Sequence, residues 1–155
     1  MLPFTAAVLF SSFAQYHRAL WPLPILAPIL ALALLVLTVR PVRHGDRATG
    51  ALLALAWLWV GIGYFVLYFA AFDFAAPGYG LLFAVQGLLL LWTGVVRGRL
   101  AFRFAGDLFD WCGLVLALAA ALAGPLGDWL WGRDWASARV VGLAPGPTAV
   151  YTLGM

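Results

Sequence analysis

One apolar stretch and a later glutamine carry the side chains best suited to bind a small neutral solute. Four residues spaced at i, i+4, i+7 and i+11 would share one helical face: Trp57, Gly61, Tyr64 and Tyr68. A glycine between aromatic residues opens a notch, and buried tyrosine hydroxyls need hydrogen-bond partners, which Gln86 can supply from a neighbouring helix. The plainer interpretation is an interhelical hydrogen bond, and the alternative is a solute-contacting pocket.

Two carboxylates beside three arginines form the other group with catalytic residue types. Asp107 and Asp110 would share a face if their segment is helical. The arginines are Arg97, Arg99 and Arg103. Local charge balance is the simpler interpretation of this set, and phosphate chemistry in a lipid-modifying enzyme is the alternative. The same arginines are also suited to contact anionic lipid headgroups.

The chain has few residues that could bind a metal ion or a cofactor. A haem or catalytic metal would need histidines on facing helices, whereas His17 and His44 are expected near opposite membrane surfaces. Cys112 is the single cysteine, so the chain can form neither an internal disulfide nor a multi-cysteine site. We therefore expect no metal and no cofactor, and an enzyme is the less favoured class.

The elements that position these residues are predicted to be membrane helices. Hydrophobic residues make up 65% of the chain and charged residues 10%, which predicts an integral membrane protein. Four apolar runs approach the length needed to cross a hydrocarbon core of ~30 Å: residues 21–39, 50–71, 79–96 and 111–130. We expect one all-α domain, a bundle of four transmembrane helices, and no nucleic-acid partner, since the arginines lie in loops.

The arginine distribution predicts an orientation, and the two ends of the chain predict further segments. Three arginines lie in each of the first and third loops, whereas the second loop has only Asp73. The positive-inside rule places the arginine loops in the cytoplasm and the amino terminus outside. Residues 1–20 predict an amphipathic interfacial helix. Residues 140–155 predict a partial or re-entrant helix whose N-terminus offers free backbone N–H groups.

Small residues at helical spacing predict how these helices pack, because close backbone contact drives helix association in lipid. One set lies on the third run: Gly80, Ala84, Gly87, Gly94 and Gly98. A second set lies on the fourth run: Gly113, Ala117, Ala121 and Gly124. We expect these two faces to meet each other, or one of them to meet a second copy of itself.

Short motifs spread over nearly the whole chain resemble a known family. They are Phe13-Ala14-Gln15-Tyr16 with Trp21-Pro22, Trp57-Leu58-Trp59 with Gly61 and Tyr64, Gly94-Val95-Val96-Arg97-Gly98-Arg99-Leu100 with Phe102-Arg103, and the tail over residues 145–154. They resemble small bacterial multi-pass membrane proteins that share a domain of unknown function. The resemblance implies a multi-pass protein of the bacterial cytoplasmic (inner) membrane and brings no activity.

The tail departs from that family in two ways. Members often carry cysteine between the two tail prolines, where this chain has Gly146. They also continue through further apolar spans, so the chain resembles a truncated or naturally short member.

Three classes of function follow from these patterns. The leading one is a non-enzymatic accessory or scaffold subunit of a membrane complex, with the lipid bilayer and a membrane-protein partner or a second copy as its contacts. The first alternative is a facilitator or carrier for a small neutral solute at the aromatic notch. A polar cavity there would favour it, and tight packing would argue against it. The second alternative is a lipid-modifying enzyme that uses Asp107 and Asp110.

Overall fold

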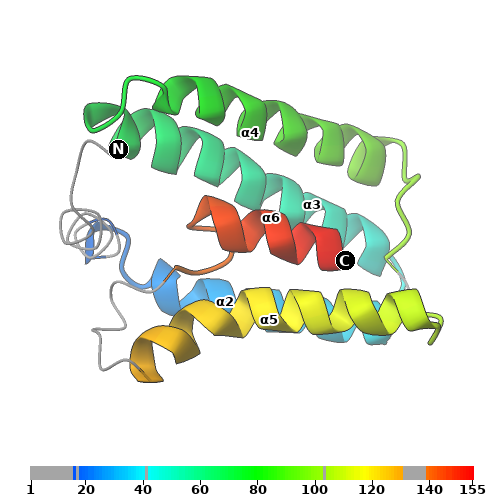
Figure 1. Cartoon of the computed structure of the whole chain (residues 1–155). Helices are drawn as coiled ribbons and strands as arrows, with labels where there is room; N and C mark the ends of the chain where they lie inside the picture. Colours follow the sequence, from blue (N-terminus) through cyan, green and yellow to red (C-terminus); the bar gives the residue numbers. More distant parts are fainter. Residues whose placement is uncertain (1–15, 17, 41, 103, 131–138) are drawn as a thin grey trace.

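The structure is a computed structural model that describes residues 16, 18–40, 42–102, 104–130 and 139–155. Within these residues every regular element is a helix (Figure 1), which confirms the all-α prediction. The α-helices are α2 (Leu23–Val39), α3 (Gly45–Trp59), α4 (Ala76–Leu90), α5 (Leu108–Leu130) and α6 (Pro145–Gly154). Shorter stretches extend two of them: the π-helix η1 (Val60–Tyr68) and the 3₁₀-helix η2 (Phe69–Ala71) follow α3, and the π-helix η3 (Leu91–Val96) follows α4.

Three of the helices are long and apolar enough to cross a membrane: Gly45–Ala71, Ala76–Val96 and Leu108–Gly127. They match the second, third and fourth expected spans and begin a few residues earlier than expected. The first expected span gives α2, an apolar helix of 17 residues. At ~1.5 Å per residue α2 is about 26 Å long, which is shorter than a typical hydrocarbon core.

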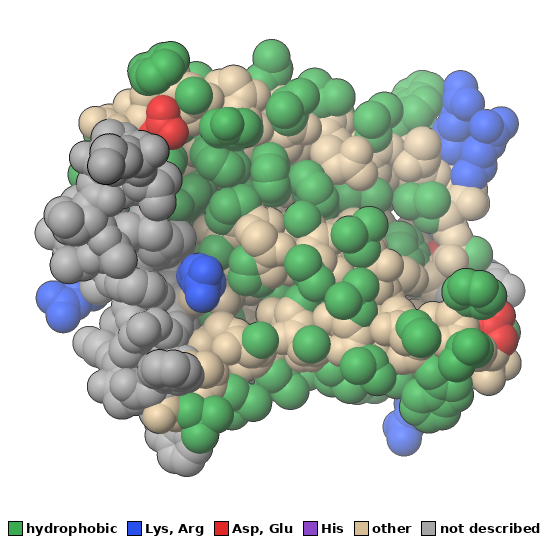
Figure 2. All heavy atoms as spheres, in the orientation of Figure 1, with side chains coloured by type: hydrophobic (Ala, Val, Ile, Leu, Met, Phe, Trp, Pro, Cys, Tyr) green, Lys and Arg blue, Asp and Glu red, His purple; other side chains and the backbone are tan. Residues whose placement is uncertain are grey.

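The surface between the two ends of the molecule is dominated by hydrophobic side chains, whereas most charged side chains lie toward the ends (Figure 2). Leu82 on α4 is 66% exposed and Val115 on α5 is 63% exposed. A soluble protein of this size would bury most such side chains, so this surface is typical of contact with lipid.

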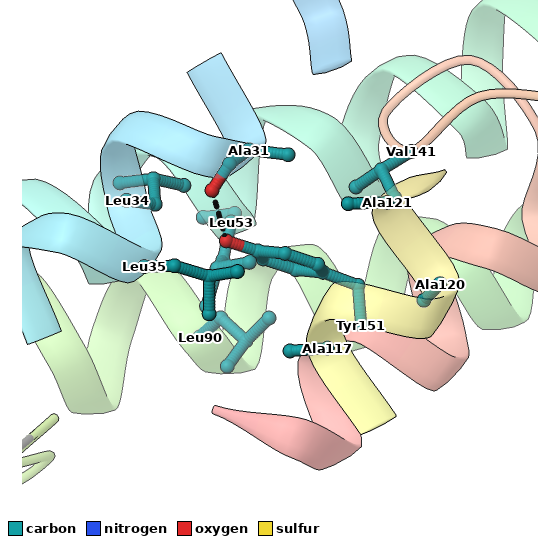
Figure 3. Packing of buried hydrophobic residues seen from close by; sticks show 11 residues of the cluster. Ala31, Leu34, Leu35, Leu53, Leu90, Ala117, Ala120, Ala121, Val141 and Tyr151 are labelled. Atoms are coloured by element: carbon teal, nitrogen blue, oxygen red, sulfur yellow. Dashed lines mark hydrogen bonds between the residues drawn. The ribbon is translucent and has the colours of Figure 1, made fainter. Parts of the chain in front are cut away.

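The helices form two pairs with α6 between them (Figure 1). α3 packs along α4, α2 packs along α5, and α6 contacts both α5 and α3. Figure 3 shows the buried cluster where these elements meet, around the side chain of Tyr151. Its members include Ala31, Leu34 and Leu35 from α2, Leu53 from α3, and Ala117 and Ala121 from α5. A ten-residue helix therefore holds the two helix pairs together.

Several expectations fall outside the part of the chain that the structure describes. The amphipathic helix expected over residues 1–20 is one of them, apart from Tyr16 and residues 18–20. His17 and Arg103 also lie outside that part.

The small residues of α4 pack against α3 and its extension. A Cβ atom added at Gly80 would lie 2.7 Å from the Gly61 carbonyl oxygen, and one at Gly87 would lie 3.1 Å from the Ala54 carbonyl oxygen. Gly94 likewise touches backbone of α3. Such distances leave no room for a side chain, so the glycines bring the two helices into backbone contact.

The small residues of α5 pack against α6 and the segment before it. A Cβ atom added at Gly113 would lie 2.7 Å from the Gly154 carbonyl oxygen, and Ala117 and Ala121 are fully buried. At Gly124 an added Cβ would overlap the carbonyl of the chain before α6. The expectation that the faces of the third and fourth runs meet each other is therefore wrong. Each face is covered by a different element of the same chain.

Candidate functional site

The notch expected at Gly61 is filled by α4. A Cβ atom added there would lie 2.8 Å from the Gly80 carbonyl oxygen and 2.9 Å from the Ala84 backbone nitrogen. The missing side chain of Gly61 thus lets η1 and α4 touch. The structure uses this glycine for helix packing and leaves no space beside it for a solute.

The aromatic face around Gly61 is divided between different partners. Trp57 faces α6, where its Nε1 donates a hydrogen bond to Thr152 Oγ1 at 2.9 Å. Its ring also lies 4.6 Å, centroid to centroid, from that of Phe83 on α4. Tyr64 and Tyr68 instead turn toward the segment before α2. The structure therefore brings the two tyrosines together and directs Trp57 elsewhere.

The π-helical segment η1 explains why α-helical spacing misplaces this face. A π-helix closes its hydrogen bonds at i→i+5 and has more residues per turn than an α-helix. Val60–Tyr68 contains Gly61 and Gly63, and glycine weakens a regular α-helix. A wider turn rotates every later side chain relative to Trp57. The glycine pair is the only signal in the sequence that points to this irregularity.

Tyr16 completes an aromatic cluster, defined here as Tyr16, Trp59, Tyr64 and Tyr68. The ring centroid of Tyr16 lies 5.7 Å from that of Tyr64 and 5.0 Å from that of Tyr68. Trp59 Nε1 donates a hydrogen bond to Tyr16 Oη at 3.0 Å. Burial raises the pKa of Tyr16 to about 12, although the Trp59 hydrogen bond acts in the opposite direction. The neutral hydroxyl therefore persists at physiological pH, and the cluster fastens the segment before α2 to η1.

Gln86 does not reach the tyrosines. It lies at the centre of the helix that runs from Ala76 to Val96, ten residues from either end. Its side chain is half-buried, and among the described residues it makes no hydrogen bond. A carboxamide has two donors and an acceptor. In a hydrocarbon core no water would be present to satisfy them.

Gln86 belongs to an exposed row on α4 that we call the α4 seam: Tyr79, Leu82, Gln86 and Leu89. The other three side chains are exposed. Their spacing of three, four and three residues is the a/d pattern with which helices pair along a seam. A polar residue at one such position sets the register between paired helices.

The carboxylates Asp107 and Asp110 form the start of α5. Asp107 Oδ1 accepts a hydrogen bond from the Asp110 backbone nitrogen at 2.8 Å. Asp110 Oδ2 reaches back and accepts hydrogen bonds from the backbone nitrogens of Ala105 and Gly106. These reciprocal bonds satisfy backbone donors at a helix start, as a capping box does. Both carboxylates are engaged with backbone groups, and the geometry pairs neither of them with a nucleophile.

Replacing Asp107 with alanine is expected to destabilise the protein by about 1 kcal/mol, because the first turn of α5 loses its cap. Asp107→Asn should be nearly neutral, since asparagine caps equally well. Unfolding by SDS in mixed micelles, followed by far-UV circular dichroism, measures both variants. A cellular phenotype that Asp107→Asn abolished without loss of stability would instead indicate acid–base chemistry at this carboxyl.

Five described arginines of the first and third loops lie at one end of the bundle: Arg40, Arg43, Arg47, Arg97 and Arg99. The Arg97 guanidinium lies 5.1 Å from the ring centroid of Trp92. Gly98 follows the end of η3 with a φ of +57°, beside the Arg47 side chain, so it is not part of the helix-packing row. None of these arginines forms an ion pair among the described residues. Arg97 and Arg99 are exposed.

The N-terminus of α6 offers fewer free donors than expected. Pro145 and Pro147 have no N–H group. Thr148 donates its own N–H to the preceding turn, and its hydroxyl accepts a hydrogen bond from the Gly142 backbone nitrogen at 2.8 Å. Among the described residues this leaves one donor of the first turn, that of Gly146, without a backbone partner. Proline and threonine therefore leave few backbone N–H groups available at the start of this short helix.

Within the described part of the chain, no three histidine, cysteine or acidic side chains gather where they could hold a metal ion. His44 precedes α3 in a left-handed conformation, with a φ of 68°. Cys112 is exposed on α5.

Comparison with known proteins gives one match. The family model described as a family of unknown function, DUF6064, matches residues 6–155. No curated protein and no solved structure matches the chain. The match covers nearly the whole sequence and confirms the resemblance inferred from the short motifs.

Proposed function

From the premise that this chain belongs to the DUF6064 family of unknown function, we propose that it is a non-enzymatic accessory or scaffold subunit of a membrane complex. The observation that carries the proposal is the carboxamide of Gln86, which has no hydrogen-bond partner among the described residues and lies at the midpoint of a helix long enough to cross a membrane. It lies on the α4 seam, beside the exposed side chains of Leu82 and Leu89. We assign this seam to a transmembrane helix of another subunit.

The energetics of the membrane interior favour such a partner. An amide without a hydrogen-bond partner in hydrocarbon costs several kcal/mol on water-to-alkane scales, on the order of 4 or more. A hydrogen bond to a neighbouring transmembrane helix contributes about 0.6 to 2 kcal/mol. The spacing of Tyr79, Leu82, Gln86 and Leu89 then adds side-chain packing on the same face.

Several other polar side chains of the described helices form hydrogen bonds within the bundle, which supports a scaffold over the two alternatives. Trp57 bonds to Thr152, the Tyr151 hydroxyl donates to the Ala31 carbonyl, and Thr38 bonds to its own helix. A solute facilitator would need polar groups facing a cavity, and η1 packs tightly at its glycine instead. A lipid-modifying enzyme would need free carboxylates, and both candidates serve as helix caps.

The topology that goes with this proposal has four transmembrane helices, with α2 as the shortest, in the bacterial cytoplasmic membrane. The ends of α2 and η3 and the start of α3 share one end of the bundle and carry the arginines of the two inner loops. The opposite end carries Asp73, Arg18 and Arg139. The larger number of arginines at the first end supports an amino terminus on the outer side.

The proposal predicts a crosslink that depends on Gln86. A photo-reactive residue introduced at Leu82 should form an adduct with another membrane chain in native membranes, identified by mass spectrometry as a partner or a second copy. Gln86→Leu should weaken this association by about 0.6 to 2 kcal/mol, and Gln86→Asn should retain much of it, because asparagine keeps the carboxamide.

The matched control is a photo-reactive residue at Leu81, which is 65% exposed on α4 but lies at a position that faces away from the seam. It should give no equivalent adduct. Equal crosslinking from Leu81 and Leu82, or a yield at Leu82 that Gln86→Leu leaves unchanged, would overturn the assignment of the seam.

A further inference from the structure

An apolar groove runs between α2 and α5 in the half of the bundle nearest the arginine-rich end. Its volume is about 550 Å³. It is lined by Leu32, Leu35, Val36, Val39, Leu114 and Leu118, with Arg40 at one end. Apart from that arginine every lining residue is aliphatic, so the groove suits a hydrocarbon chain.

Arg40 gives this groove a charged mouth. It follows the last residue of α2, where a helix ends at the membrane surface. Its side chain is exposed and forms no ion pair among the described residues. A guanidinium binds phosphate oxygens in a bidentate manner and keeps its charge at any physiological pH. A cation above an aliphatic channel matches the two halves of a phospholipid.

We infer that the α2–α5 groove holds one anionic phospholipid from the membrane leaflet at the arginine-rich end. One acyl chain lies along the leucines of α2 and α5, and the headgroup phosphate lies on the Arg40 guanidinium. This inference requires only that the bundle lies in a membrane as proposed. It is independent of the helix partner of the α4 seam.

The charges around the mouth are compatible with an anionic headgroup. The adjoining pocket is lined by one acidic residue of the described chain, Asp110, together with Thr38. Its carboxylate accepts two backbone hydrogen bonds from Ala105 and Gly106, which compensate part of its charge. We therefore expect Arg40 to give the groove a preference for lipids with an anionic headgroup.

A second groove in the same molecule serves as an internal comparison. It lies between α2 and α3, has a volume of about 330 Å³ and is floored by Tyr151 and the segment before α6. No charged residue lines it. A lipid chain in this groove should show no preference for an anionic headgroup.

The test is lipid retention by the purified protein, measured by native mass spectrometry after exchange into nanodiscs of equal parts phosphatidylglycerol and phosphatidylcholine. The wild-type chain should retain phosphatidylglycerol preferentially. Arg40→Gln should lower the ratio of the two retained lipids about fivefold, the effect expected of one surface arginine. Arg40→Lys should restore part of the preference.

Two matched controls distinguish a specific lipid site in the groove from a general attraction of anionic lipid to the arginines of the loop. Arg43→Gln removes the same charge from the same loop but lies outside the groove, so it should change the ratio less than twofold. Leu118→Trp fills the groove and should lower the total lipid retained, whereas Val115→Trp on the outer face of α5 should not. Circular dichroism verifies that each variant is folded.

Three results would overturn the inference. They are an absence of headgroup preference in the wild-type chain, equal effects of Arg40→Gln and Arg43→Gln, and unchanged lipid retention by a folded Leu118→Trp variant. A wild-type chain that retains the anionic lipid but gives no crosslink through the α4 seam would refute the scaffold proposal alone.

Discussion

Gly80→Ala is expected to destabilise the bundle by about 1 to 3 kcal/mol, the range for overpacking a tight interface. The new methyl group would lie 2.7 Å from the Gly61 carbonyl oxygen and 2.9 Å from a methyl group of Val66. Backbone cannot move aside as a flexible side chain can, so α4 must separate from η1. The loss should appear as unfolding at a lower SDS mole fraction, followed by far-UV circular dichroism.

Gly78→Ala is the matched control because it makes the same change on the same helix. An added Cβ at Gly78 would meet no atom within 4 Å. Alanine in a helix is favoured over glycine by about 0.5 to 1 kcal/mol, so this variant should be slightly stabilised. The two substitutions should therefore differ in sign. Equal effects would show that α4 does not contact η1 at Gly80.

Tyr151→Ala is expected to cost about 2 to 5 kcal/mol, because it empties a fully buried position and leaves a cavity. Tyr151 fills the space between α2, α3 and α5, and its hydroxyl donates a hydrogen bond to the Ala31 carbonyl at 2.5 Å (Figure 3). The same SDS titration measures the loss. Cleavage by an added protease at the C-terminal residues should also become faster as α6 detaches.

Two further variants divide this effect into its parts. Tyr151→Phe keeps the ring and removes the hydroxyl, so it should cost only about 0.6 to 2 kcal/mol. Leu153→Ala shortens a side chain of the same helix that is 79% exposed, and should be close to neutral. If Tyr151→Ala were as mild as Leu153→Ala, the placement of α6 within the bundle would be incorrect.

The sequence was sufficient to predict the helical elements. Hydropathy and the positions of charges are local properties of the chain. From them, the starts of three helices that could cross a membrane were predicted to within a few residues. A partial helix within residues 140–155 was also expected, with Thr148 as its cap. The helix instead begins at Pro145, three residues earlier, after Ala144 as its N-cap. Helix formation in lipid satisfies the backbone within each segment, so no distant residue is needed to decide it.

The candidate site was predicted less well, for reasons specific to particular residues. Trp57, Gly61 and the two tyrosines were placed on one face by α-helical spacing, and the π-helix η1 breaks that spacing. Tyr16 was missed as the partner of the tyrosines, since 43 residues separate it from Trp59. Gln86 was expected to bond within the chain, and the packing of α3 against α4 leaves its carboxamide without a partner among the described residues.

Which faces meet was decided by the tertiary structure alone. The glycine rows predicted close packing correctly but not its partners: α4 packs on α3, and α5 packs on α6. The bonds from Trp57 to Thr152 and from Tyr151 to Ala31 join residues 95 and 120 positions apart. Local composition determines whether a segment is helical in a membrane. The pairing of helices depends on the summed van der Waals contacts and hydrogen bonds of surfaces that only the folded chain brings together.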